Sequence, residues 1–170
     1  IPNISDSNQR GYSIQNGGYY LPISDFFDLT ILGDYYTNGS YGINISSIYR
    51  KRYNYNGTFS VRYENLINGE RGLPGYGKST VYNIRWSHSK DSKASPNSSF
   101  SASVNFGSSD YFRQSVNQLN TANFLNNNLS SSISYSKSFP GSAGVRLSLT
   151  ANMSQNTQSK QVNLNLPTLT

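Results

Sequence analysis

The stretch SFSASVNF, residues 99–106, decides the fold, because apolar side chains alternate strictly with small polar ones. Successive side chains of an extended strand point to opposite faces, so this pattern predicts a strand with one apolar and one polar face. VRLSLTANM (145–153) and QVNLNL (161–166) repeat the pattern. No stretch shows the 3.6-residue period of an amphipathic helix, so we expect almost no helix.

Turn signals divide the chain into about nine strands. Asn38-Gly39, Asn56-Gly57, Ser95-Pro96-Asn97 and Pro140-Gly141 indicate tight connections, and 68–78 and 109–127 indicate longer ones. Consecutive hairpins without helical crossovers predict an all-β, antiparallel up-and-down meander. The strands are expected near 10–21, 25–36, 40–52, 57–67, 79–90, 98–108, 128–138, 144–156 and 160–167.

The composition favours a membrane β-barrel over a soluble domain. Only 35% of the 170 residues are hydrophobic and 13% are charged, yet the chain holds 14 Tyr and 8 Phe. Disordered chains lack aromatic residues, whereas a barrel with a polar interior has low mean hydropathy. The runs match the roughly 9–11 residues of a tilted membrane-spanning strand. Aromatic residues near the run ends suggest interfacial girdles: Tyr19, Tyr20, Phe26, Phe27, Tyr35, Tyr36, Tyr53, Tyr55, Trp86 and Phe139.

Other classes are disfavoured by charge and by residue usage. The net charge of +6 could attract nucleic acid, but the cations are scattered and no nucleic-acid partner is expected. Their one cluster, Arg50-Lys51-Arg52, is interpreted as a solvated loop edge. The chain has no Cys and no stretch of about 18 apolar residues, which excludes a disulfide scaffold and a transmembrane helix.

GLPGYGKST, residues 72–80, matches the phosphate-binding P-loop pattern through Gly72, Gly77, Lys78 and Ser79. A true P-loop opens a helix, whose N-terminal amides hold the phosphates. Here a β-branched, aromatic run with a period of two follows Ser79. We therefore interpret the motif as a hairpin loop and expect no nucleotide or other cofactor.

The sequence also shows no arrangement of residues that is typical of a catalytic or metal-binding site. His88 is the single histidine, and no nucleophile elbow or acidic residue accompanies it, so a structural or interfacial role is expected. Asp25, Asp28 and Asp34 lie near one hairpin, where lumenal hydrogen bonding is favoured over acid–base catalysis. The sequence predicts neither an enzyme nor a metal site.

One family resemblance rests on YYLPISDFFDLT (19–30), TNGSYGINISSIYRKRY (37–53), WSHSKDSKASPNSSFSASVNFGSS (86–109) and LSSSISYSKSFPG (129–141). These pieces resemble LptD, the outer-membrane lipopolysaccharide-assembly proteins, in their Bacteroidetes-type members. The resemblance implies that residues 1–170 form one partial outer-membrane β-barrel domain, a fragment of a larger chain in a Gram-negative bacterium. It also implies lipopolysaccharide, outer-membrane lipid, an LptE-like lipoprotein plug and a periplasmic Lpt bridge as partners.

In that family, lipopolysaccharide passes through a lateral gate between the first and last strands, and prolines weaken the seam. Gly18 and Gly33 stand at the corresponding positions here and are the expected gate residues. The polar face would line the lumen. Its expected members are Asp28, Thr30, Ser101, Ser103, Asn105, Ser148 and Thr150.

Two alternatives remain open from the residues alone. One is a generic porin or transporter barrel fragment, and the other is a soluble β-sheet adhesin that binds carbohydrate through its tyrosines. Orientation is also open, because nine strands starting from the periplasm would place the long connections 68–78 and 109–127 on the periplasmic side. Outer-membrane barrels have short periplasmic turns, so either the strand count is off by one or the usual rule fails.

Overall fold

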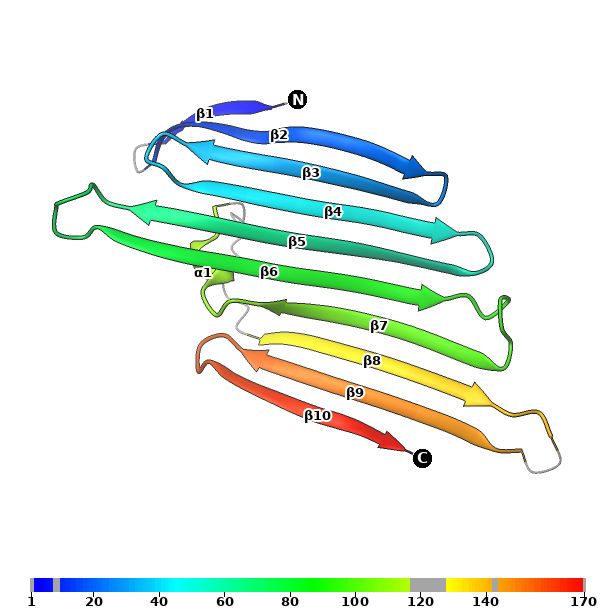
Figure 1. The fold of residues 1–170 in the computed structure, drawn as a ribbon. Coiled ribbons are helices and arrows are strands. Elements are labelled where there is room, and N and C mark those ends of the chain that lie inside the picture. Colours follow the sequence, from blue (N-terminus) through cyan, green and yellow to red (C-terminus); the bar gives the residue numbers. More distant parts are fainter. Residues whose placement is uncertain (1, 8–9, 117–127, 142–143, 170) are drawn as a thin grey trace.

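The computed structural model describes residues 2–7, 10–116, 128–141 and 144–169, which form one antiparallel sheet (Figure 1). Each strand pairs with the next one along the chain, which confirms the all-β up-and-down meander. One helical turn, α1 (Tyr111–Gln114), is the helix content of the described residues. The strands are β1 (Asn3–Ser7), β2 (Gly11–Ser24), β3 (Phe27–Tyr36), β4 (Tyr41–Lys51), β5 (Tyr55–Asn68), β6 (Gly77–Lys90), β7 (Ser98–Gly107), β8 (Asn128–Ser138), β9 (Arg146–Asn156) and β10 (Gln161–Leu169).

The sheet has ten strands, one more than expected. The additional strand is β1, whose sequence NISDS contains a single apolar residue and so carries no alternation. The expected connection 109–127 begins with α1, and its residues 117–127 lie outside the described residues.

The turn expected at Asn56-Gly57 is wrong, because both residues lie within β5. The chain reverses instead at residues 52–54, where Tyr53 adopts a φ of 61°. Position 57 requires glycine because there is no room for a side chain, and not because the chain turns there. A Cβ there would collide with the ring of Tyr49 on β4 and with the carbonyl of Ser87 on β6.

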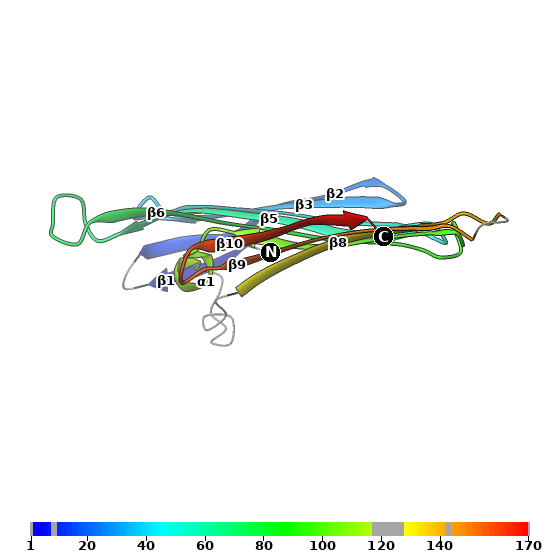
Figure 2. The same cartoon turned by 90° about the horizontal axis from the view of Figure 1, so that it is seen from below.

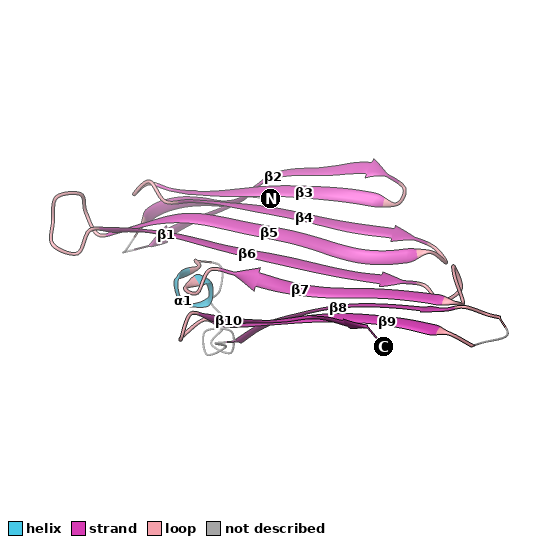
Figure 3. Ribbon diagram, turned by 60° about the horizontal axis from the view of Figure 1, so that its bottom comes forward, coloured by secondary structure: helices cyan, strands magenta, loops and turns pink. Residues whose placement is uncertain are grey.

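The sheet is a single open layer. Figure 2 shows it nearly edge-on, with α1 beside one face, and Figure 3 shows α1 near the ends of β6 and β7. Among the described residues, β1 pairs only with β2 and β10 only with β9, so the sheet does not close on itself. The fold is thus that of an unrolled stretch of barrel wall.

A small hydrophobic core forms where α1 meets the sheet. Leu66 of β5, Val81 of β6, Leu129 of β8 and Tyr111 of α1 pack together, with Val116 against them. Leu66, Val81 and Leu129 are at most 1% exposed. Many other large apolar side chains remain exposed, which an isolated soluble sheet would not tolerate.

The connections divide between two ends of the sheet. We call the end that holds the β1–β2, β3–β4, β5–β6, β7–β8 and β9–β10 connections the loop end, and the opposite one the turn end. The loop end is on the left of Figure 1. Both long connections, β5–β6 and β7–β8, lie at the loop end.

Candidate functional site

Strand register sorts the side chains into an apolar face and a polar face. Directly opposed residues of neighbouring antiparallel strands share a face. Ile45 of β4 stands opposite Ile31 of β3 and Val61 of β5, and Val61 stands opposite Ile84 of β6. These aliphatic residues form the middle of the apolar face.

Aromatic rows border this aliphatic band. Towards the loop end, Tyr41 and Tyr63 have ring centroids 6.4 Å apart. Towards the turn end, Tyr49 and Tyr55 lie 6.1 Å apart. At about 3.3 Å per residue, the stretch of β4 from Tyr41 to Tyr49 is about 26 Å long, which gives about 20 Å of height at the roughly 40° tilt of barrel strands. A membrane barrel carries an apolar band about 25 Å tall between two aromatic girdles, and the apolar face has this layout.

His88 belongs to the turn-end aromatic row. Its Nδ1 lies 2.9 Å from the Tyr49 hydroxyl, and that hydroxyl accepts a 2.8 Å hydrogen bond from Trp86 Nε1. The imidazole also stacks on Tyr55, with centroids 6.0 Å apart. His88 therefore sits in an aromatic hydrogen-bonded cluster, and in the described part of the chain its side-chain hydrogen bond goes to Tyr49 rather than to a carboxylate that could orient it for catalysis.

The residues predicted to be polar and lumenal share the opposite face. Ser101 of β7 and Ser134 of β8 exchange a hydrogen bond of 2.7 Å, and Ser134 also stands opposite Thr150. The Asp28 carboxylate accepts a hydrogen bond of 2.8 Å from the Ile48 amide. By register, all seven belong to one face: Asp28, Thr30, Ser101, Ser103, Asn105, Ser148 and Thr150.

A buried network of charged side chains lies on the polar face, and the sequence pattern did not predict it. Arg62 of β5 pairs with Glu64 at 2.8 Å and also with Asp34 of β3. The carboxylate side chains are at most 1% exposed. Gly42 of β4 stands between Asp34 and Glu64, and a Cβ there would lie 2.9 Å from the Arg62 guanidinium. The missing side chain at Gly42 leaves the guanidinium room to cross the strand.

Glu64 also anchors the α1 segment to the wall. Its carboxylate accepts hydrogen bonds of 3.0 Å from the Ser115 hydroxyl and 3.2 Å from the Val116 amide. Residues 110–116 therefore lie over the polar face and are fixed there by a buried charge. Hydrogen bonds to a buried charged acceptor are stronger than neutral ones.

The expected gate residues lie beside the outer edge of β2. Gly17, rather than Gly18, stands directly opposite Gly33 of β3, and Gly18 stands opposite Leu32. The pairing is interrupted next to them, between Ile14 and Gly17, where Asn16 adopts a φ of 55°. β1 covers only Gly11–Gln15, so in the described chain β2 has no outer partner from Asn16 onward.

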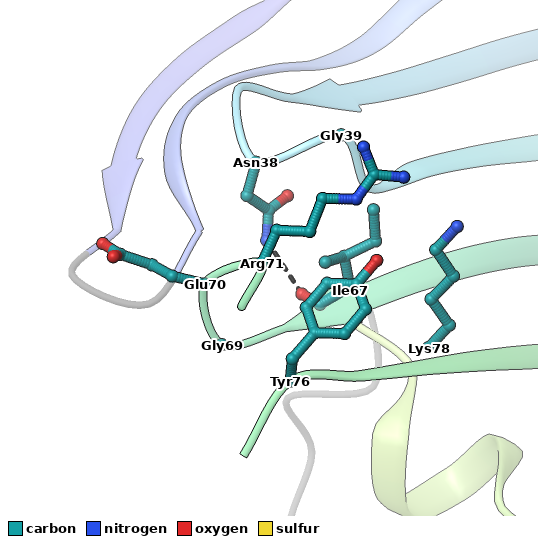
Figure 4. A pocket seen from close by; sticks show the side chains of 8 residues that line it. All are labelled: Asn38, Gly39, Ile67, Gly69, Glu70, Arg71, Tyr76 and Lys78. Atoms are coloured by element: carbon teal, nitrogen blue, oxygen red, sulfur yellow. Dashed lines mark hydrogen bonds between the residues drawn. The ribbon is translucent and has the colours of Figure 1, made fainter. Parts of the chain in front are cut away.

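The P-loop pattern lies in the β5–β6 connection and the start of β6, and Figure 4 shows Tyr76 and Lys78 lining a pocket there. Gly72 lies in the β5–β6 connection at a φ of 94°, and Gly77 begins a strand rather than a helix. Lys78 stands opposite Ile67 in the sheet and borders a cavity of about 430 Å³ with Tyr76 and Arg71. The geometry offers none of the stacked helix N-terminal amides that hold phosphates.

The described part of the chain contains no group of three or more His, Cys, Asp or Glu residues that could hold a metal. It also contains no helix long and apolar enough to cross a membrane.

Comparison with known families decides the assignment, because the model of the LptD protein family matches residues 1–170. The chain belongs to the LptD family. No curated protein and no solved structure is significantly similar to it. LptD proteins act in lipopolysaccharide transport and assembly at the outer membrane of Gram-negative bacteria, and the open antiparallel sheet of this LptD-type chain is consistent with a fragment of a β-barrel.

Proposed function

We propose that this LptD-type chain forms the part of the barrel wall beside a lateral opening through which lipopolysaccharide is inserted into the outer leaflet. The observation that carries the proposal is the two-faced sheet of a chain in this family. One face of the sheet carries an aliphatic band between two aromatic rows, as a membrane barrel does, and the other face is polar.

The polar face would line the lumen. Its serine, threonine and asparagine side chains offer hydrogen bonds to the sugar-rich part of lipopolysaccharide, as in the 2.7 Å pair between Ser101 and Ser134. The α1 segment, anchored by Glu64, would narrow the lumen at the loop end. The apolar face would meet lipid.

The lateral opening would lie at the outer edge of β2. Asn16–Ser24 is the longest stretch of that edge that β1 leaves uncovered. Glycine weakens strand pairing, so the Gly17–Gly33 pair and the neighbouring bulge would let this edge move. In this arrangement Gly33 and Gly17 act together, and Gly18 contributes through its tight approach to the Ile31 carbonyl.

Orientation follows from the lengths of the connections. Outer-membrane barrels have short periplasmic turns and longer extracellular loops. The lengths of the β5–β6 and β7–β8 connections support a loop end at the cell exterior and a turn end in the periplasm. A periplasmic Lpt bridge would deliver lipopolysaccharide from the turn end, and an LptE-like plug would occupy the space before the polar face.

Crosslinking across the opening tests this function. A photoreactive amino acid at Tyr20, beside the uncovered edge of β2, should capture lipopolysaccharide in cells during its transport. The same group at Ser87, in the middle of the sheet on β6, is a matched control for general proximity to the lumen. Failure to capture lipopolysaccharide at Tyr20, or capture at Tyr20 no stronger than at Ser87, would refute the lateral opening.

A further inference from the structure

Cationic and aromatic side chains gather at the turn end. All four cation–π contacts of the described residues lie in its hairpins, and we call this group the basic rim. The pairs are Lys51 over Phe26 at 5.9 Å, Arg52 over Tyr53 at 5.1 Å, Lys93 over Tyr53 at 5.4 Å and Lys137 over Phe139 at 4.9 Å.

Tyr53 joins two neighbouring hairpins of the rim. Its ring carries Arg52 from its own turn and Lys93 from the β6–β7 turn. The backbone ties the same turns together, because the Asp91 amide donates a 2.8 Å hydrogen bond to the Asn54 carbonyl. The cations are thus held in place by rings rather than spread over a mobile surface.

The rim encloses a cavity of about 220 Å³ at the end of β4 and β5. Three consecutive cations, Arg50, Lys51 and Arg52, line it together with Tyr53 and Tyr55. The one carboxylate in the lining is Asp91, which already accepts a 2.9 Å hydrogen bond from the Lys93 amide. No ion pair among the described residues neutralises the three cations.

The depth of the cavity in the membrane identifies its ligand. Lys51 stands opposite Tyr55, a member of the turn-end aromatic row, and Arg52 and Tyr53 follow in the turn, so the cavity lies at the outer border of that row. Aromatic belts mark the headgroup level of a bilayer, and arginine and lysine side chains extend into that layer. A cationic cavity at this depth would face lipid phosphates.

We propose that the basic rim is a binding site for the anionic headgroup of a phospholipid in the periplasmic leaflet. Lys51 and Arg52 would contact the phosphate, Arg50 would add its positive charge from the polar-face side of β4, and Tyr53 and Tyr55 would lie along the glycerol. Such a site would fix the depth and tilt of the wall while the edge of β2 opens. The choice of leaflet rests on the proposed orientation of the barrel, whereas the headgroup site itself does not.

Lipid titration of the full-length protein in neutral detergent tests the site. The probe is a fluorescent short-chain phosphatidylglycerol, with phosphatidylcholine as the zwitterionic comparison. The rim variant carries Arg50→Gln, Lys51→Gln and Arg52→Gln. The control carries Arg71→Gln, Lys78→Gln and Lys160→Gln at the loop end, which change the net charge equally. Circular dichroism checks that both remain folded, and Arg50→Lys with Arg52→Lys retains the charge if the Gln variant unfolds.

We expect the unaltered protein and the loop-end control to bind phosphatidylglycerol equally, and the rim variant to bind it roughly tenfold or more weakly, since each cation near an anionic surface contributes roughly fivefold. Equal binding by the rim variant and the control would overturn the proposal. Displacement of the lipid by millimolar inorganic phosphate would also overturn it, because the site would then hold a free anion. If lipid binding depends on the rim but the protein inserts no lipopolysaccharide, the headgroup site is supported and the proposed function is refuted.

Discussion

The guanidinium of Arg62 passes over strand β4 and forms an ion pair with Asp34 on the second strand away. The pair is buried on the polar face, and the same guanidinium holds Glu64, which in turn holds the α1 segment. One arginine therefore connects β3 to β5 and, through Glu64, to the α1 segment.

Replacing this arginine should destabilise the wall strongly. Arg62→Leu leaves two buried carboxylates without their cation, and we expect a loss of about 3 kcal/mol in the free energy of unfolding. Urea titration of the protein in lipid vesicles measures the change. Arg85→Leu is the matched control, because Arg85 is exposed on the neighbouring strand β6. Similar losses for both variants would contradict the role given to the network.

Filling the space at Gly42 should break the same network without removing a charge. A Cβ at Gly42 would lie 2.9 Å from Arg62 and 3.3 Å from Glu64. Gly42→Val should therefore separate the guanidinium from Asp34 and lower stability by about 1–3 kcal/mol. Gly77→Val, at the start of β6, has open space around it and should be tolerated. A Gly42→Val protein as stable as the parent would show that the guanidinium does not cross β4.

Loosening the α1 segment should leave most of the sheet intact. Glu64→Gln removes the charged acceptor for Ser115 and Val116, so we expect faster amide hydrogen exchange in residues 110–116. The weakened bonds to a buried charge are each worth about 1.5–3 kcal/mol. The amides of β4 serve as the internal reference. Unchanged exchange at Val116 would mean that the hydrophobic cluster alone fixes the segment.

Tightening the edge of β2 should slow the delivery of lipopolysaccharide. Gly17 and Gly33 have room for a Cβ, whereas Gly18 does not, because its Cβ would strike the Ile31 carbonyl. The double substitution Gly17→Val with Gly33→Val places two β-branched side chains directly opposite each other and should strengthen the pairing of β2 with β3 by about 0.2–1 kcal/mol. Labelling of newly exported lipopolysaccharide at the cell surface measures the rate. Transport at the parental rate with both valines present would remove the gate role from these glycines.

The sheet could be predicted from the sequence because period-two alternation fixes both the strand and its faces. β7 and β9, with their strict alternation, were expected within about two residues of their observed bounds. β1 was missed because one isoleucine among polar residues gives no period. Gly57 was assigned to a turn because the sequence does not show that the Tyr49 ring lies over it.

The charge network could not be predicted because alternation gives the face of a residue but not its partner. Arg62 and Glu64 lie two residues apart in β5, so the alternation places both on the polar face. In a chain with so few charged residues, this spacing indicates an ion pair. Asp34 became their neighbour only through the register of β3, β4 and β5. The contacts of Ser115 and Val116 depend on the path of a loop, which the alternating pattern does not describe.

The most direct test concerns two adjacent residues of β9, Ser148 on the polar face and Leu149 on the apolar face. A photoreactive amino acid is placed at each position in turn, and crosslinked lipopolysaccharide is detected in cells during transport. If the polar face lines the path, the residue at 148 captures lipopolysaccharide and the residue at 149 captures phospholipid. Capture of lipopolysaccharide at 149 but not at 148 would contradict the assignment of the two faces.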